Sequence, residues 1–278
     1  MGLCLWSTWI EPPPLWVVGA AFGFYLALIL AGVFVPGLGM YATVHSHGAR
    51  DRRRVALTFD DGPHPQTTRA VLEMLEQHQA KATFFVVGEK VERHPDVVRE
   101  IVAQGHSLGL HGFAHDRLLS LRTPAFVARD IERTQRAIEG ACGRRPTLFR
   151  PPVGFISPRT AAAAKRANVQ FIGWSARGFD GRGSISASRL VQRIEGQLEP
   201  GAIVLLHDAA ERDDFTPAVL SALPNILEAI EARGLVAVTV EQLLNLEHTE
   251  SVATSEADPF EAARSPSLVS DQETRSMR

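Results

Sequence analysis

Two adjacent carboxylates follow an apolar run in the first third of the chain. Asp60 and Asp61 come directly after residues 55–59 and are followed by Gly62 and Pro63. Removing two carboxylates from water is costly unless a positive group lies beside them. Neighbouring side chains on extended backbone point in different directions, so one carboxylate can bind a cation while the other accepts a proton. Asp-Gly-Pro is also ordinary turn chemistry, which leaves a surface turn as the alternative.

A pair of histidines stands four residues apart at His111 and His115. Both imidazoles reach one side of the chain if this loop turns helically. Together with one carboxylate they make a three-ligand site with open positions, the pattern of catalytic zinc or a similar divalent ion. Because the chain has 10 histidines, such a pair also arises by chance, and alone it is a weak signal.

Three further polar residues follow short apolar runs. Arg150 precedes two prolines that fix the direction of its loop, and His207 ends the most apolar run of this region. Asp180 follows another predicted strand and is placed to orient His207. Chemistry in α/β barrels lies where strands end, so we expect these residues to meet the aspartates and histidines on one face.

The elements that would position them alternate between Arg54 and Leu246. Predicted strands cover 55–59, 82–87, 107–110, 148–149, 169–173, 202–206 and 236–240. Predicted helices cover 67–79, 95–104, 124–138, 160–167, 190–198 and 218–232. This alternation indicates a parallel sheet, and about seven strands predict a distorted (β/α) barrel.

The N-terminal region predicts a membrane anchor. After a short segment of residues 1–14, residues 15–35 are all apolar or small and would span roughly 31 Å as one transmembrane helix. A cleavable signal peptide fits less well, because no Lys or Arg precedes the run and the run is long. The arginines that follow would place the domain in the cytoplasm by the positive-inside rule. Some of them also begin the first predicted strand, which leaves the side of the membrane open.

Composition excludes other classes of protein. The chain has 29 Lys and Arg against 31 Asp and Glu, a net charge of −2, whereas a nucleic-acid-binding protein would carry a basic excess. Cys4 and Cys142 are its only cysteines, so we expect neither a disulfide framework nor a cysteine zinc site.

On these motifs the sequence resembles the polysaccharide deacetylase family (carbohydrate esterase family 4, the NodB-homology domain). The matching motifs are, in chain order, Thr58–Pro63, His111-x-x-x-His115, Arg150–Gly154, Asp180 and Leu205–His207. The resemblance assigns residues 54–246 to this domain and leaves 36–53 as a linker. Residues 247–278 are rich in Ser, Thr, Glu and Ala with few large apolar residues, a composition that predicts a disordered tail.

The resemblance implies a metal-dependent hydrolase that acts on carbon–nitrogen bonds other than peptide bonds and removes N-acetyl or other acyl groups from amino sugars. Asp61, His111 and His115 would bind the divalent ion, zinc in the first place, with cobalt, nickel and iron as alternatives. Asp60 would be the general base and His207 the general acid.

Supporting roles follow from the same resemblance. Arg150 would tether Asp60, and Asp180 would hold His207. The backbone N–H of Val153 would stabilise the oxyanion, and Leu205 would line the pocket for the acetyl methyl group.

Three positions depart from the family's pattern. Val153 stands in place of an aromatic residue, Gly181 in place of tryptophan, and Arg177 where many members carry aspartate. These departures leave the substrate's identity open, including an acyl group other than acetyl or an unusual sugar. The side of the membrane leaves a second choice, between an N-acetylated polysaccharide outside the cell and a lipid-linked sugar in the cytoplasm.

Other functions fit less well. Gly105–Gly109 matches the G-x-S-x-G elbow of serine hydrolases, with Ser107 as nucleophile, but the predicted helix precedes the serine and the strand follows it, the reverse of that motif. A glycoside hydrolase needs two carboxylates roughly 5–10 Å apart and leaves the histidines unexplained. An inactive, membrane-tethered glycan-binding domain is the remaining alternative.

Overall fold

The N-terminal apolar run forms a helix, as predicted. The computed structural model describes residues 13–35, 38–181, 185–212 and 215–246, so most of the segment 1–14 and all of the tail 247–278 lie outside the described residues. Helix α1 (Leu15–Phe34) is long and apolar enough to cross a membrane, and only 6% of its most apolar stretch is buried. A signal sequence would have the same length and composition.

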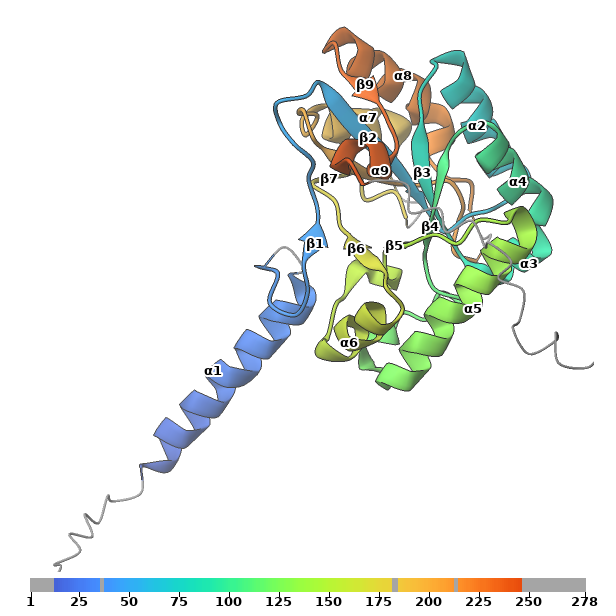
Figure 1. The fold of residues 1–278 in the computed structure, drawn as a ribbon. Helices are drawn as coiled ribbons and strands as arrows, with labels where there is room; N and C mark the ends of the chain where they lie inside the picture. Colours follow the sequence, from blue (N-terminus) through green and yellow to red (C-terminus); the bar gives the residue numbers. More distant parts are fainter. Residues whose placement is uncertain (1–12, 36–37, 182–184, 213–214, 247–278) are drawn as a thin grey trace, which may run out of the picture. The chain divides into compact units, whose positions relative to one another are not determined.

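The strands form one parallel sheet in the order β1-β6-β5-β4-β3-β2-β8-β7, with β9 paired to β2 (Figure 1). They are β1 (Val44–His45), β2 (Arg54–Asp60), β3 (Ala82–Val86), β4 (Ser107–Leu110), β5 (Leu148–Phe149), β6 (Gln170–Ile172), β7 (Ala176–Arg177), β8 (Ile203–His207) and β9 (Val236–Ala237). β1 and β7 stand at the two ends of this order, and among the described residues no strand pairing joins them. A single antiparallel bridge from His47 to Ala202 links the two ends of the sheet. The expected distorted (β/α) barrel is thus confirmed in an incompletely closed form.

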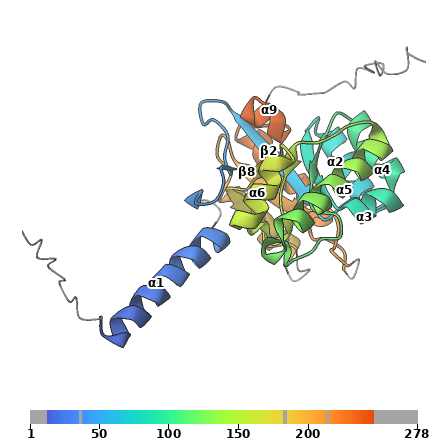
Figure 2. The same ribbon diagram turned by 60° about the horizontal axis from the view of Figure 1, so that its bottom comes forward.

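Helices cover the outside of this barrel, and in both views α2, α4 and α5 lie together (Figure 2). They are α2 (Thr67–Gln77), α3 (Gly88–Arg93), α4 (Pro95–Ala103), α5 (Pro124–Cys142), α6 (Pro158–Arg166), α7 (Ala187–Glu195) and α8 (Val219–Ala232). The largest cluster of buried apolar side chains joins these helices to the sheet. A smaller cluster, which includes Ala56, Phe85 and Ile203, fills the barrel interior and packs on helix α9 (Val240–Leu244).

The structure differs from the sequence predictions at its shortest elements. Part of segment 36–53, expected to be a linker, is strand β1, which pairs with β6. Strand β7 was not predicted, and the predicted strand 236–240 ends at Ala237 because Thr239 and Gln242 cap helix α9. Elements of two residues are too short to show a periodic pattern.

Candidate functional site

The candidate residues meet at the carboxyl ends of the strands. Asp60 ends β2 and lies beside His207, which ends the neighbouring strand β8. His111 follows β4, and Arg150 follows β5. Asp60, His111 and His207 line a cleft of about 780 Å³, as expected for the functional face of an α/β barrel, and Arg150 is buried beneath them.

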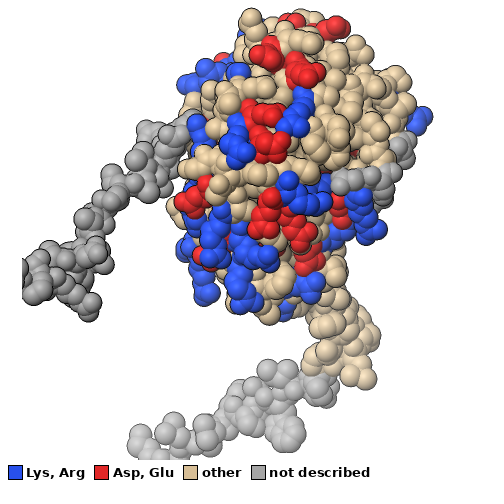
Figure 3. All heavy atoms as spheres, turned by 90° about the vertical axis from the view of Figure 1, so that its right-hand side faces the viewer, with Lys and Arg blue, Asp and Glu red and all other residues tan. Residues whose placement is uncertain are grey.

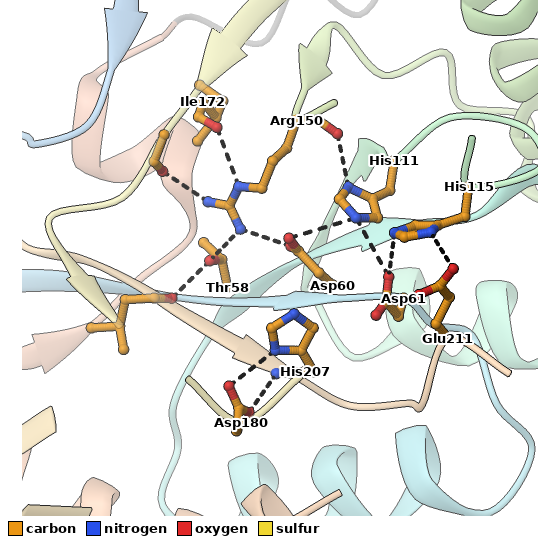
Figure 4. A network of polar contacts seen from close by, with 12 residues as sticks. Thr58, Asp60, Asp61, His111, His115, Arg150, Ile172, Asp180, His207 and Glu211 are labelled. Atoms are coloured by element: carbon orange, nitrogen blue, oxygen red, sulfur yellow. Dashed lines mark hydrogen bonds and ion pairs between the residues drawn. The ribbon is translucent and has the colours of Figure 1, made fainter. Parts of the chain in front are cut away.

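Asp61, His111 and His115 form a compact cluster (Figure 4). The Oδ1 atom of Asp61 lies 3.1 Å from Nε2 of His115 and 3.4 Å from Nε2 of His111. One ligand atom from each residue lies within 4.8 Å of the others, which allows a single metal ion to be shared. The structure therefore brings both imidazoles to one side of their loop, beside Asp61, as the spacing of four residues predicts.

The donor atoms of this cluster fit a divalent cation. Nδ1 of His111 lies 2.8 Å from the carbonyl oxygen of Arg150, so Nδ1 donates to that carbonyl and Nε2 is directed towards Asp61. The Oδ1 atom of Asp61 is buried without a hydrogen bond in the described part of the chain. Burial raises the pKa of Asp61, but the imidazoles of His111 and His115 hold that pKa well below its usual value. Asp61 is therefore an ionised, unsatisfied acceptor that a cation would complete.

One oxygen of Asp60 is held by a buried arginine. Arg150 is 1% exposed, and its Nη1 donates to Oδ1 of Asp60 at 2.7 Å and to Thr58 at 2.8 Å. The rest of the guanidinium donates to the backbone carbonyls of Ile172 and Gly173. The second oxygen, Oδ2 of Asp60, lies 3.8 Å from Nε2 of His111. Arg150 thus fixes Asp60 and leaves Oδ2 available.

His207 is held by Asp180, apart from the two other histidines (Figure 4). Nδ1 of His207 lies 3.0 Å from Oδ1 of Asp180, and the backbone N–H of His207 donates to Oδ2 at 2.9 Å. Burial alone would lower the pKa of His207, but Asp180, with smaller contributions from Asp61 and Asp60, raises it to about 9. The ring is therefore protonated at neutral pH, and Asp180 fixes its orientation.

One departure from the family's pattern, Gly181, has a local structural reason. A Cβ atom at Gly181 would lie 2.8 Å from Nε2 of His207, so no larger residue fits there while the ring keeps this position. Val153 has φ 65 and lines the cleft with an exposed side chain. Leu205 lies on the cleft floor, 9% exposed.

Sequence reasoning missed Glu211. Its Oε1 atom lies 3.2 Å from Nδ1 of His115, and its carboxylate also pairs with Arg117. Burial lowers the pKa of His115, but the charges of Asp61 and Glu211 raise it above its usual value. Carboxylates in this position commonly orient metal-binding histidines. No sequence pattern links Glu211 to His115, because the two lie on separate loops.

Ser107 lies at the start of β4, at the opposite end of that strand from His111. Its hydroxyl donates to Glu241 at 2.6 Å and lies 2.7 Å from the hydroxyl of Thr83. The serine-hydrolase alternative therefore fails on two counts. Ser107 does not line the cleft, and among the described residues its hydroxyl contacts Thr83 and Glu241 and no histidine.

Comparison with known proteins gives consistent matches over this domain. The model of the family described as polysaccharide deacetylase matches residues 47–172. A chitooligosaccharide deacetylase of Bradyrhizobium sp. is 35% identical over 211 residues, which are 72% of this chain and 94% of the relative. A solved peptidoglycan N-acetylglucosamine deacetylase is similar with a TM-score of 0.66 and 29% identity, over 72% of this chain and 92% of that one. A mutant of a CE4 family pseudoenzyme from Bacillus anthracis, with restored enzymatic activity, is similar with a TM-score of 0.65 and 26% identity, over 71% and 70% of the two chains.

Proposed function

Since this chain belongs to the polysaccharide deacetylase family, carbohydrate esterase family 4, we propose that it is a membrane-anchored, metal-dependent hydrolase that removes N-acetyl groups from amino sugars. Residues 54–246 would form the catalytic domain. The observation that carries the proposal is the cluster of Asp61, His111 and His115, flanked by a proton acceptor, Asp60, and a proton donor, His207.

Asp61, His111 and His115 would hold the divalent ion, which when bound polarises the acetamide carbonyl and acidifies a water molecule. Two imidazoles and a carboxylate suit zinc, and also cobalt, nickel and iron. Glu211 would fix the ring of His115 through Nδ1, as the carbonyl of Arg150 fixes that of His111.

Two proton transfers would be divided between Asp60 and His207. Oδ2 of Asp60 is the oxygen that Arg150 leaves free, and it would take the proton of the attacking water. His207, kept protonated by Asp180, would donate a proton to the departing sugar amine. Arg150 and Asp180 would act as positioning residues, which keep the acceptor and the donor in place.

The acyl group would be held by residues that line the cleft. The backbone N–H of Val153 would donate to the oxyanion that forms as water attacks the carbonyl. Leu205 would contact the acetyl methyl group, which favours a small apolar acyl chain.

Helix α1 supports a single-pass anchor, which would keep the catalytic domain beside the bilayer. The substrate would be a glycan that contains N-acetylglucosamine, as in the named relatives, or a lipid-linked sugar precursor if the domain faces the cytoplasm. A reporter fused after Leu246 decides between the two sides of the membrane.

The direct test is release of acetate from an N-acetylglucosamine oligosaccharide by the purified chain. We expect acetate release, its loss after treatment with a chelator, and its return when zinc is restored. A rate that does not change after the metal has been removed would rule out the metal-dependent mechanism.

A glycan-binding protein without turnover is the second candidate, because a relative of similar fold is described as a pseudoenzyme. Metal binding and saccharide binding without acetate release from any acylated sugar would support it. The presence of both Asp60 and His207 in the cleft favours the enzyme.

The raised pKa of His207 predicts a pH dependence. An Asp180→Asn variant removes the charge that raises this pKa to about 9, while burial continues to lower it. A general acid works only while protonated, so activity should fall with rising pH, and the fall should begin at lower pH in the variant. Profiles of kcat against pH for both proteins measure the shift. Identical alkaline limbs would show that His207 is not the proton donor.

A further inference from the structure

One wall of the cleft carries three arginines that the proposed reaction does not use. Arg177 ends β7, and Arg189 and Arg193 lie on α7. All three side chains are exposed and line the cleft. None of them forms an ion pair with a carboxylate in the part of the chain that the structure describes.

The acidic groups of the same cleft are engaged elsewhere. Asp180 contacts His207, and Glu211 contacts His115 and Arg117. Asp60 and Asp61 belong to the proposed catalytic centre. The arginine wall is therefore a local excess of positive charge beside that centre.

Some other surface arginines of this chain are paired with carboxylates. Arg69 pairs with Asp96 and Glu100, and Arg145 pairs with Glu139. Basic and acidic side chains also lie intermixed on the face shown in Figure 3.

An exposed phenylalanine organises two of the three arginines. The guanidinium carbon of Arg177 lies 3.9 Å from the centre of the Phe179 ring, and that of Arg193 lies 5.3 Å from it. Nη1 of Arg193 also donates to the carbonyl oxygen of Gly178 at 3.1 Å. Phe179 itself has φ 62, a conformation that bulky residues rarely adopt and that is concentrated at functional sites. This backbone conformation places the Phe179 ring beside the guanidinium groups of Arg177 and Arg193, and both groups contact it.

The third arginine adds a like charge on the same helix face. Arg189 and Arg193 are four residues apart on α7, a spacing at which like charges destabilise a helix. An anion bound between the guanidinium groups would relieve this repulsion and would accept paired hydrogen bonds from them.

We propose that Arg177, Arg189 and Arg193 form an anion-binding subsite that selects glycans with a carboxylate or phosphate next to the N-acetylated sugar. This proposal rests on the proposed function and names the substrate class more narrowly. Asp180, which orients the proton donor, directly follows Phe179. The anion would therefore lie on the side of the sugar where the amine departs.

Matched substrates test the subsite. The first is a neutral tetrasaccharide of N-acetylglucosamine, and the second is a tetrasaccharide in which alternate sugars carry a lactyl carboxylate. The third has those carboxylates converted to neutral methylamides, and the fourth is uridine diphosphate N-acetylglucosamine, which carries a diphosphate instead.

We expect kcat/KM to be about tenfold or more higher for an anionic substrate than for its neutral counterpart, mainly through KM. This preference should shrink as salt is raised. A preference for the second substrate identifies a carboxylate as the anion, and one for the fourth identifies a phosphate. Equal kcat/KM for all four would overturn the subsite.

If none of the substrates releases acetate, the proposed function fails, and the subsite is then judged by binding alone. Tighter binding of the carboxylated tetrasaccharide than of its methylamide supports the subsite, and equal affinity overturns it.

Variants test which arginines are responsible. Arg189→Gln and Arg193→Gln should each reduce the ratio of anionic to neutral kcat/KM by about tenfold. Arg129→Gln makes the same change of charge on an exposed part of α5 outside the cleft and should leave the ratio unchanged. An equal loss on anionic and neutral substrates, in variants whose thermal unfolding is unaltered, would contradict anion recognition.

Discussion

An Asp60→Asn variant should lose on the order of 10³-fold or more in kcat while it keeps its metal. The amide has nearly the same shape as the carboxylate, and its oxygen can still accept the hydrogen bond from Nη1 of Arg150. It cannot accept the proton of the attacking water. Oδ2 of Asp60 lies 3.8 Å from His111, and Asp60 is not part of the cluster that could hold the ion.

The measurement combines acetate release with metal content per chain. Asp51→Asn is the matched control, because it makes the same chemical change on an exposed residue away from the cleft. Full activity of the Asp60→Asn variant would remove Asp60 from the role of base. Loss of both metal and activity would assign Asp60 to the metal instead.

His111→Ala should lose both the metal and turnover. The substitution removes one of three donors and leaves the buried oxygen of Asp61 with one imidazole beside it. We expect metal affinity to fall by at least two orders of magnitude, since changes to partners that only orient such ligands already cost about 10–100-fold. Metal content after dialysis, titration with zinc and acetate release measure the effect.

Two further variants serve as comparisons for the metal affinity of His111→Ala. His78→Ala removes an imidazole that contacts Glu231 outside the cleft and should retain the metal. Glu211→Gln removes a charge that contacts His115 and Arg117 but none of the three proposed ligands, and its metal affinity should lie between those of His111→Ala and the unaltered protein. A folded His111→Ala protein that binds zinc as tightly as the parent would refute the ligand assignment, and circular dichroism checks that the variant is folded.

Much of the barrel could be predicted from the sequence, because its longer strands are mostly apolar. Strands β2, β3, β4 and β8 lie where the apolar runs predict them. Each of these strands is buried over most of its length, and burial on both faces gives an unbroken apolar run. Strands β1 and β7 have two residues each, and their position depends on pairing with distant segments rather than on local pattern.

Most residues of the candidate site could be predicted from the sequence, but the distances and contacts between them could not. Asp60, His111, Arg150 and His207 all follow apolar runs, and the rule that parallel strands end on one face brings them together. Glu211 could not be found in this way. It reaches His115 across the cleft from a loop beyond β8, and neither residue type nor spacing marks that contact.

The sequence by itself determined which chemical groups are present: the paired aspartates, the His111 and His115 pair, a further histidine at a strand end and an apolar run long enough to cross a bilayer. Only the tertiary structure decided which atoms face which. It directs Nε2 of His111 towards Asp61, leaves one oxygen of Asp60 free of Arg150, and gathers arginines from β7 and α7 around Phe179. The physical reason is that residue type and periodicity act along the chain. The direction of a side chain is instead fixed by hydrogen bonds and packing between segments that only folding brings into contact.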